Sequence, residues 1–154
     1  MRDDNGKKTD KVIIANCSGF FGDRLSAAKE MVQGGPIDFL TGDYLAELTM
    51  AILFRSKMKD PGSGYVSTFL RQMEQVMGEC LDRKIRVVSN AGGLNPKALA
   101  EELKRVATEL GLHPKIAYIE GDDLMARLGE LQAAGEQFEH MDKGIALADS
   151  RAMT

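Results

Sequence analysis

The sequence predicts an α/β protein, a three-layer sandwich of the Rossmann-like or flavodoxin-like type with a mainly parallel sheet of about four strands. Three observations support this fold class. Short β-branched runs alternate with segments of helical periodicity. Loops rich in glycine and asparagine separate the runs from the helices, as expected for βαβ units. A length of 154 residues is enough for one such domain with a sizeable buried core.

Four short runs rich in valine and isoleucine are the expected strands. They are Val12–Ala15, Ile37–Leu40, Ile85–Ser89 and Ile116–Ile119. Helices between them should make right-handed crossovers. If the strand order is 2-1-3-4, the order reverses between the first and third strands. Open α/β sheets bind ligands at such a point, outside the carboxyl ends of the strands.

Helical periodicity marks the segments between and after these runs. Helices are expected from about Arg24 to Gln33, from Asp43 to about Ser56, and from Tyr65 to Leu81. A fourth follows Asn95, and a fifth opens at 121–123. The run 50–54 in the second helix is apolar on more than one face, which indicates either full burial or a subunit contact.

The ends of the chain are less regular than its middle. Residues 1–11 are polar and charged and are interpreted as a disordered leader. The α/β domain is expected to span 12–133. Residues 134–154 are weakly patterned, and we expect them to continue into a longer region.

Composition excludes several classes of partner. The net charge is −3, without the clustered Lys and Arg that nucleic acid or an anionic membrane attracts, so neither is expected. No apolar run approaches the length of a membrane span. Cys17 and Cys80 are the only cysteines, which leaves one possible bridge and favours a reducing, cytoplasmic compartment.

The loops that follow the strands carry the candidate site. They are rich in Gly, Asn, Asp, Ser and Thr, whereas the loops at the opposite end are short and turn-like. Residues expected to contact a substrate are Asn16, Ser18, Gly19, Phe20, Phe21, Gly22, Asp43, Asn90, Gly92, Gly93 and Asn95.

The side chains in these loops suggest distinct roles. Glycine amides can approach an anionic group closely, and Arg24 can add a forked, charge-assisted contact. Asp23 can move a proton or orient a hydroxyl group. Phe20 and Phe21 can line an apolar pocket, although packing in the core is an equal alternative.

Structural roles compete with these functional ones. Asp23, Asp43 and Asn95 stand where helix caps belong, so capping alone is an alternative for each. Asn16 and Asn90 end their strands, where asparagine often serves a turn.

The best-known site motifs are absent from the sequence. Neither glycine-rich loop matches a dinucleotide fingerprint or a Walker A loop, so no cofactor is assigned. There is no G-x-S-x-G elbow, and no His or Cys group has zinc-ligand spacing. No metal is assigned, and carboxylates are the only remaining ligands for one.

Three blocks of sequence carry a resemblance to a known family. They are Asn16–Arg24 (NCSGFFGDR), Ile37–Glu47 (IDFLTGDYLAE) and Val88–Pro96 (VSNAGGLNP). In this order they resemble the N-terminal part of the acyclic terpene utilisation (AtuA) family. The resemblance implies a role in bacterial catabolism of acyclic terpenes such as citronellol and geraniol. It implies no catalytic residues, and family members are typically longer than this chain.

Two kinds of function follow from the loops and the resemblance. The first is an enzyme domain for a branched terpenoid acid or its CoA thioester, with hydratase or lyase chemistry carried by Asp23 and Arg24. The second is a non-catalytic module that binds CoA or a nucleotide, or that assembles with another chain. In either case we expect a homo-oligomer or association with the remainder of a longer protein.

Overall fold

A computed structural model describes residues 11–150, which form two compact units divided between Ile119 and Glu120. The first unit contains a parallel sheet of β1 (Ile14–Asn16), β2 (Phe39–Gly42) and β3 (Arg86–Ser89), in that spatial order. The α/β class and the parallel sheet are confirmed, with three strands in the described chain. Residues 1–10 of the expected leader and 151–154 of the C-terminal segment lie outside the described residues.

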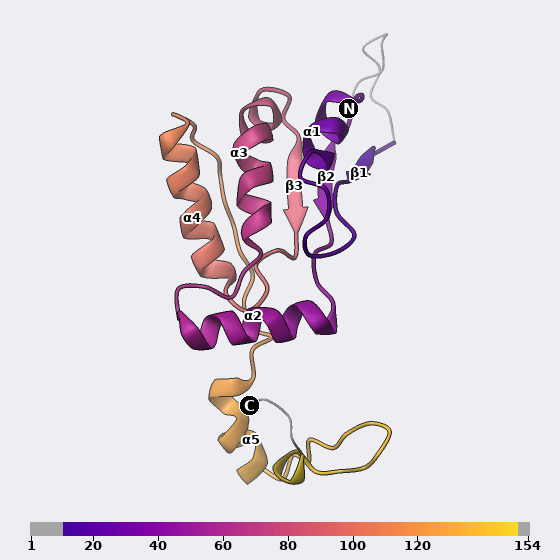
Figure 1. The fold of residues 1–154 in the computed structure, drawn as a ribbon, viewed down its shortest axis with the longest axis vertical. Helices are drawn as coiled ribbons and strands as arrows, with labels where there is room; N and C mark the ends of the chain where they lie inside the picture. The colour runs from indigo at the N-terminus through magenta and orange to yellow at the C-terminus, as the bar shows by residue number, and fades with distance from the viewer. Residues whose placement is uncertain (1–10, 151–154) are drawn as a thin grey trace. The chain divides into compact units, whose positions relative to one another are not determined.

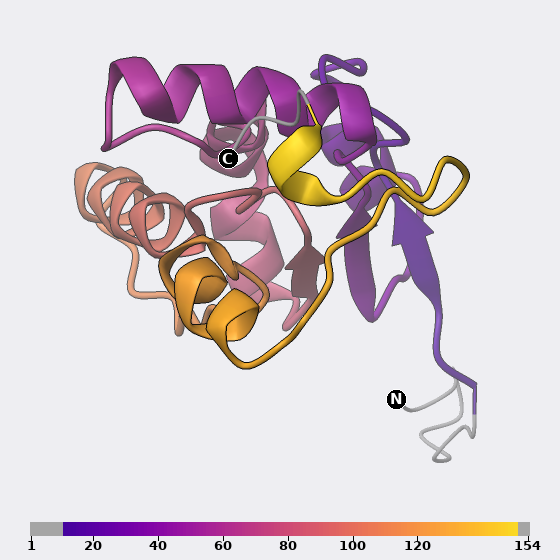
Figure 2. The same cartoon turned by 90° about the horizontal axis from the view of Figure 1, so that it is seen from below.

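The strands are joined by helices. Helix α1 (Ala27–Gln33) connects β1 to β2, whereas α2 (Glu47–Lys59) and α3 (Ser67–Asp82) together connect β2 to β3. Helix α4 (Pro96–Glu109) follows β3 and packs beside α3. Figure 1 shows α2 crossing the direction of the strands at the end where they finish, and Figure 2 shows it beside the strands rather than in line with them.

The core lies between the sheet and one layer of helices. Leu40, in the central strand, is fully buried. On α3 the buried residues recur at helical spacing, because a single face of that helix meets the core. These residues are Phe69, Gln72, Met73, Val76, Met77 and Cys80. The helical periodicity predicted between Tyr65 and Leu81 is therefore confirmed, and the structure adds a buried glutamine to the apolar residues of this face.

The other face of the sheet is open within the described residues. Because side chains alternate along a strand, Ile14, Phe39 and Val88 lie on the face opposite Leu40. Ile14 is 62% exposed and Val88 is 57% exposed. The Arg86 guanidinium lies 5.7 Å from the centre of the Phe39 ring on this face.

The N-terminus of α4 forms as its sequence predicts. The Asn95 side chain accepts a hydrogen bond from the Ala98 amide at 3.2 Å, and Pro96 occupies the first turn. Gly111, with φ of +68°, follows the last turn. Asn95 is therefore confirmed as a helix cap.

Two predictions about the sheet are wrong. Ile116–Ile119 is not a strand: the segment has no assigned secondary structure, and Ile119 is 91% exposed. A β-branched run forms a strand only where a partner offers backbone hydrogen bonds, and no such pairing is formed here. The order 2-1-3-4 is also wrong, because β2 lies between β1 and β3.

Helix α2 begins later than predicted. It starts at Glu47 after Ala46, whose extended backbone has φ of −151°, and it runs on to Lys59. Asp43 does not cap this helix, because its carboxylate accepts a hydrogen bond from the side chain of Asn90. Helix α1 likewise begins at Ala27 rather than Arg24, without a side-chain cap.

The second described unit, 120–150, is small. It contains the short helices η1 (Met125–Arg127), α5 (Leu128–Ala133) and η2 (Leu147–Asp149), so the fifth predicted helix is shorter than its pattern suggests. An antiparallel bridge joins Glu139 to Ala146. No residue from 120 to 150 is fully buried. Across both described units, no helix combines the length and apolar character that crossing a membrane requires.

Candidate functional site

Hydrogen bonds join the three loops that follow the strands: the first loop (17–26) after β1, the second loop (43–46) after β2 and the third loop (90–95) after β3. The Asp43 amide donates to the Ser18 carbonyl oxygen at 3.0 Å, which links the first and second loops. Asn90 Nδ2 donates to Asp43 Oδ1 at 2.7 Å, and the Tyr44 amide donates to Asn90 Oδ1 at 2.9 Å. The second loop, following the central strand, therefore bridges the other two. The structure thus brings together Ser18, Asp43 and Asn90 from three separate predicted blocks.

The first loop folds around Asp23. Its carboxylate accepts hydrogen bonds from the Gly19 amide at 3.0 Å and the Arg24 amide at 2.6 Å. The Gly19 amide, followed by the Arg24 amide, holds the pKa of Asp23 below its usual range. The carboxylate is therefore ionised at neutral pH. Asp23 closes this loop rather than capping α1.

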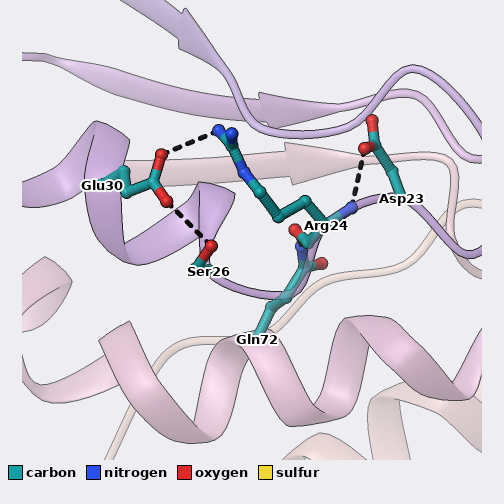
Figure 3. A network of polar contacts seen from close by, with 5 residues as sticks. All are labelled: Asp23, Arg24, Ser26, Glu30 and Gln72. Atoms are coloured by element: carbon teal, nitrogen blue, oxygen red, sulfur yellow. Dashed lines mark hydrogen bonds and ion pairs between the residues drawn. The ribbon is translucent and has the colours of Figure 1, made fainter.

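Arg24 points away from Asp23 and toward α1 (Figure 3). Its Nη2 forms an ion pair with Glu30 Oε2 at 2.7 Å, and the other Glu30 oxygen accepts from Ser26 Oγ at 2.8 Å. Both charged side chains are exposed, so water screens their attraction. Arg24 would therefore lose little free energy if it left Glu30 and paired with another anion.

A buried polar pair lies beneath the loops. The Tyr44 hydroxyl donates to Gln72 Oε1, and Gln72 Nε2 donates to the Arg24 carbonyl oxygen at 3.3 Å. Each residue is 1% exposed. Burial is the main cause that raises the pKa of Tyr44, so its hydroxyl keeps its proton. Sequence reasoning missed both residues, although a glutamine between Phe69 and Val76 on an apolar helix face was a usable signal.

Cys17 belongs to the same buried region. Its Sγ lies 3.8 Å from the Tyr44 hydroxyl oxygen. Burial raises the pKa of the Cys17 thiol, which keeps it protonated and unreactive at neutral pH. Cys17 is therefore placed as an ordinary buried residue rather than as a nucleophile.

The two neighbouring phenylalanines have different environments. Phe20 is 58% exposed at the surface of the first loop, whereas Phe21 is partly buried against the hydrophobic core. Of the two alternatives for this pair, contact with an apolar ligand fits Phe20, and packing in the core fits Phe21. Phe20 is available to an apolar ligand, and Phe21 anchors the loop.

The glycines also differ in what surrounds them. A Cβ at Gly92 would lie 2.7 Å from Pro96 Cβ, and one at Gly93 would lie 2.4 Å from Leu53 Cδ1. Packing therefore explains why these two positions lack side chains. Gly22 has φ of +89° and open space around it, and Gly19 is almost as open. Among the glycines predicted to contact a ligand, Gly19 and Gly22 therefore have more free space around them than Gly92 and Gly93.

The polar groups of Asn95 and Asn16 are already engaged. Besides capping α4, Asn95 donates from Nδ2 to the Ser63 carbonyl oxygen at 2.9 Å and to the Pro61 carbonyl oxygen at 3.2 Å. Asn16 donates from Nδ2 to the Ser18 carbonyl oxygen at 2.9 Å. The two carbonyl partners of Asn95 belong to the turn between α2 and α3, and the carbonyl partner of Asn16 belongs to the first loop. Their ligand contacts stay predictions.

Asp43 is the second carboxylate of the site. The Asn90 side chain, and then the Leu45 amide, hold the pKa of Asp43 below its usual range. Asp23 and Asp43 thus give this edge two negative charges at neutral pH. In residues 11–150, no three His, Cys, Asp or Glu side chains form a group that could hold a metal ion.

Comparison with known proteins gives one match. The profile of the family described as acyclic terpene utilisation family protein AtuA matches residues 12–154. No curated protein and no solved structure matches the chain. The family match covers nearly the whole sequence and includes every loop of the candidate site. The chain therefore belongs to the acyclic terpene utilisation (AtuA) family.

Proposed function

We propose that the first unit binds the activated head of a branched, terpene-derived acid at the carboxyl end of its sheet. The observation that supports this most is the bridging of the three strand-end loops through Asp43. Membership of a family of acyclic terpene utilisation supplies the substrate class. Phe20, exposed on the same set of loops, offers an apolar contact for the branched chain.

The charge at Asp23 and Asp43 favours the neutral carbonyl of a thioester over the carboxylate of the free acid at the head of the substrate. Asp23 and Asp43 are both ionised at neutral pH and repel a carboxylate. A thioester carbonyl is neutral, and the open backbone around Gly22 can approach its oxygen. Arg24 would leave Glu30 and pair with a phosphate of CoA.

The chemistry that fits these groups is hydration, or the related lyase reaction. A carboxylate with a depressed pKa is a weak base at neutral pH, so orienting a water molecule suits Asp23 better than abstracting a proton. A water molecule held by Asp23 would add across a double bond conjugated with the thioester: its hydroxyl bonds to the β carbon, its proton goes to the α carbon, and the π bond between these carbons is lost. In this proposal Asp23 is the catalytic residue, and Arg24 binds the substrate.

Titration calorimetry tests the proposal with three probes: geranoyl-CoA, geranic acid and free CoA. We expect geranoyl-CoA to bind more tightly than geranic acid, and Arg24→Ala to weaken its binding about tenfold, which is the loss of one charge-assisted contact. Asp23→Asn should abolish turnover, and it should also weaken binding because it loses one of the two backbone hydrogen bonds that close the first loop. Equal binding of acid and thioester would contradict the charge argument, and an unaffected Arg24→Ala variant would contradict the assigned contact.

A second candidate function is assembly with another chain. The exposed apolar residues Ile14 and Val88 on the sheet, with Leu48 and Met58 on α2, favour it. The partner would be a second copy or the remainder of a longer protein. Sedimentation velocity tests self-association: a dimer that depends on concentration supports a second copy of the chain as the partner. A strict monomer argues against self-association. A monomer that also fails to bind the thioester rejects the proposed binding domain as well.

The proposed compartment is the cytoplasm. Cys17 and Cys80 are both free and buried, which suits a reducing environment. Fractionation of producing cells, followed by detection of the chain, checks this directly. Recovery from an oxidising compartment would contradict it.

A further inference from the structure

We infer that Gln72 is a positioning residue of the proposed site, which holds the first loop through the Arg24 carbonyl oxygen and the second loop through the Tyr44 hydroxyl. The inference rests on the proposed function and assigns a role to a residue of α3 outside the three loops. Gln72 is 1% exposed on a helix face that is otherwise apolar. A buried amide is costly unless it is hydrogen bonded, so an apolar residue would suit packing alone at this position.

Both ends of the Gln72 amide are used. Its Oε1 accepts from the Tyr44 hydroxyl of the second loop, and its Nε2 donates to the Arg24 carbonyl oxygen of the first loop. In Figure 3 the side chain reaches from α3 toward the main chain at Arg24, next to Asp23. The amide therefore holds the carbonyl group of Arg24, the residue that follows the proposed catalytic Asp23.

Tyr44 extends the connection to the third loop. Its ring packs edge-on against Phe69 of α3, with centroids 5.7 Å apart, which fixes the direction of its hydroxyl. Its backbone amide donates to Asn90 Oδ1 at 2.9 Å. A continuous connection thus runs from Asn90 through Tyr44 and Gln72 to Arg24, in addition to the hydrogen bonds that join the loops through Asp43.

The first loop has few other anchors. Gly19, Phe20 and Gly22 are exposed, and Gly22 has open space around it. Phe21 and the buried Cys17 and Ser18 hold the beginning and middle of the loop. The Arg24 carbonyl oxygen also accepts from the Ala27 amide at 3.1 Å, so Gln72 is the contact that ties this peptide group to α3. Removing the Gln72 amide should therefore loosen that peptide while α3 remains folded.

Amide hydrogen exchange on the full 154-residue chain tests this independently of any ligand. Gln72→Met keeps the length and packing of the side chain but removes both hydrogen bonds. We expect the amides of Gly19 and Arg24, which donate to Asp23, to exchange about tenfold faster, as for the loss of one buried hydrogen bond. Amides of β2 and of the middle of α3 should keep their wild-type rates.

Two further variants separate positioning from packing. Gln72→Glu keeps an acceptor for Tyr44 in both protonation states, but only its ionised form lacks a donor for the Arg24 carbonyl. It should therefore loosen the first loop alone, and only at a pH high enough to ionise the buried carboxyl group. Gln75→Met, at an exposed position on the same helix, is the control and should change nothing. A uniform acceleration of all amides in Gln72→Met, or no acceleration at Gly19 and Arg24, overturns the inference.

Binding of geranoyl-CoA supplies the functional measurement. We expect Gln72→Met to weaken binding about tenfold and Gln75→Met to leave it unchanged. Loosened loop amides with undiminished binding would overturn the role of Gln72 in the site. If the wild-type chain does not bind geranoyl-CoA, the proposed function fails, and the exchange rates alone decide whether Gln72 positions the loop.

Discussion

Gly93→Ala should destabilise the protein more than an ordinary loop substitution. Gly93 has φ of +53°, and an added Cβ would lie 2.4 Å from Leu53 Cδ1 and 2.9 Å from the Gly64 carbonyl oxygen. The left-handed backbone costs an alanine about 1–2 kcal/mol. Forcing a methyl group into a packed site costs about 1–3 kcal/mol more. The expected loss in the free energy of unfolding is therefore about 2–5 kcal/mol.

Gly111→Ala is the matched control, because Gly111 has φ of +68° and nothing within 4 Å of an added Cβ. It should lose only the backbone contribution of about 1–2 kcal/mol. Urea unfolding of both variants measures the difference, which is the cost of the contact between α2 and the third loop. Equal stability of the two variants would refute the packing of Leu53 against Gly93.

Three further predictions concern the cap, the carboxylates and the cysteines. Asn95→Ala should lower the free energy of unfolding by about 1–3 kcal/mol, measured in urea, because it removes the cap and two loop contacts; an unchanged midpoint would count against the observed cap. Asp43 has a folded pKa below its unfolded one, so its stabilisation is present above the unfolded value of about 4 and is lost as the pH falls through the folded pKa. The drop in the urea midpoint under acid should therefore be smaller in Asp43→Asn, and an identical acid profile would contradict this. Burial raises the pKa of Cys80 to about 11 and also raises that of Cys17, so iodoacetamide at pH 8 should label neither until the chain unfolds; fast labelling of the folded chain would show that the thiols are accessible.

The sequence predicted local structure well where side-chain patterns repeat. The stripe on α3 and the cap and first turn of α4 depend on residues close in the chain, so spacing alone reveals them. Strand order depends on contacts far apart in sequence. The crossover from β2 to β3 contains two helices, and no short motif specifies that β2 lies in the centre. The run 116–119 has the composition of a strand, but whether a strand forms depends on a pairing partner that the local sequence does not reveal.

The candidate site was predicted as a location rather than as a set of contacts. Strand-end loops rich in glycine and asparagine marked where Ser18, Asp43 and Asn90 would gather. The hydrogen bonds of Asp23 and Asp43 were not predictable, because helix caps and loop closures use the same residue types. Gln72 could have been noticed as a polar residue on an apolar helix face. Nothing in the sequence linked it to Tyr44, which lies 28 positions earlier.

The division of roles among the loops has a consequence for redesign. The third loop is packed tightly around Gly92 and Gly93, whereas the first loop has open space at Gly22. Substitutions that reshape ligand preference should therefore be tolerated better in the first loop. Under the proposed function, Phe20, which is exposed and outside the core, is the position at which a substitution would alter the size of the bound apolar group.

Amide chemical-shift mapping during titration with geranoyl-CoA tests most directly whether the strand-end loops bind an activated terpenoid acid. The proposal predicts saturable shifts at Gly19, Gly22 and Asn90, with small changes in the turns at the opposite end of the sheet. Geranic acid should produce the same pattern only at higher concentration, because the carboxylates of Asp23 and Asp43 repel it. Shifts confined to the opposite end, or none at saturating thioester, would contradict the proposal.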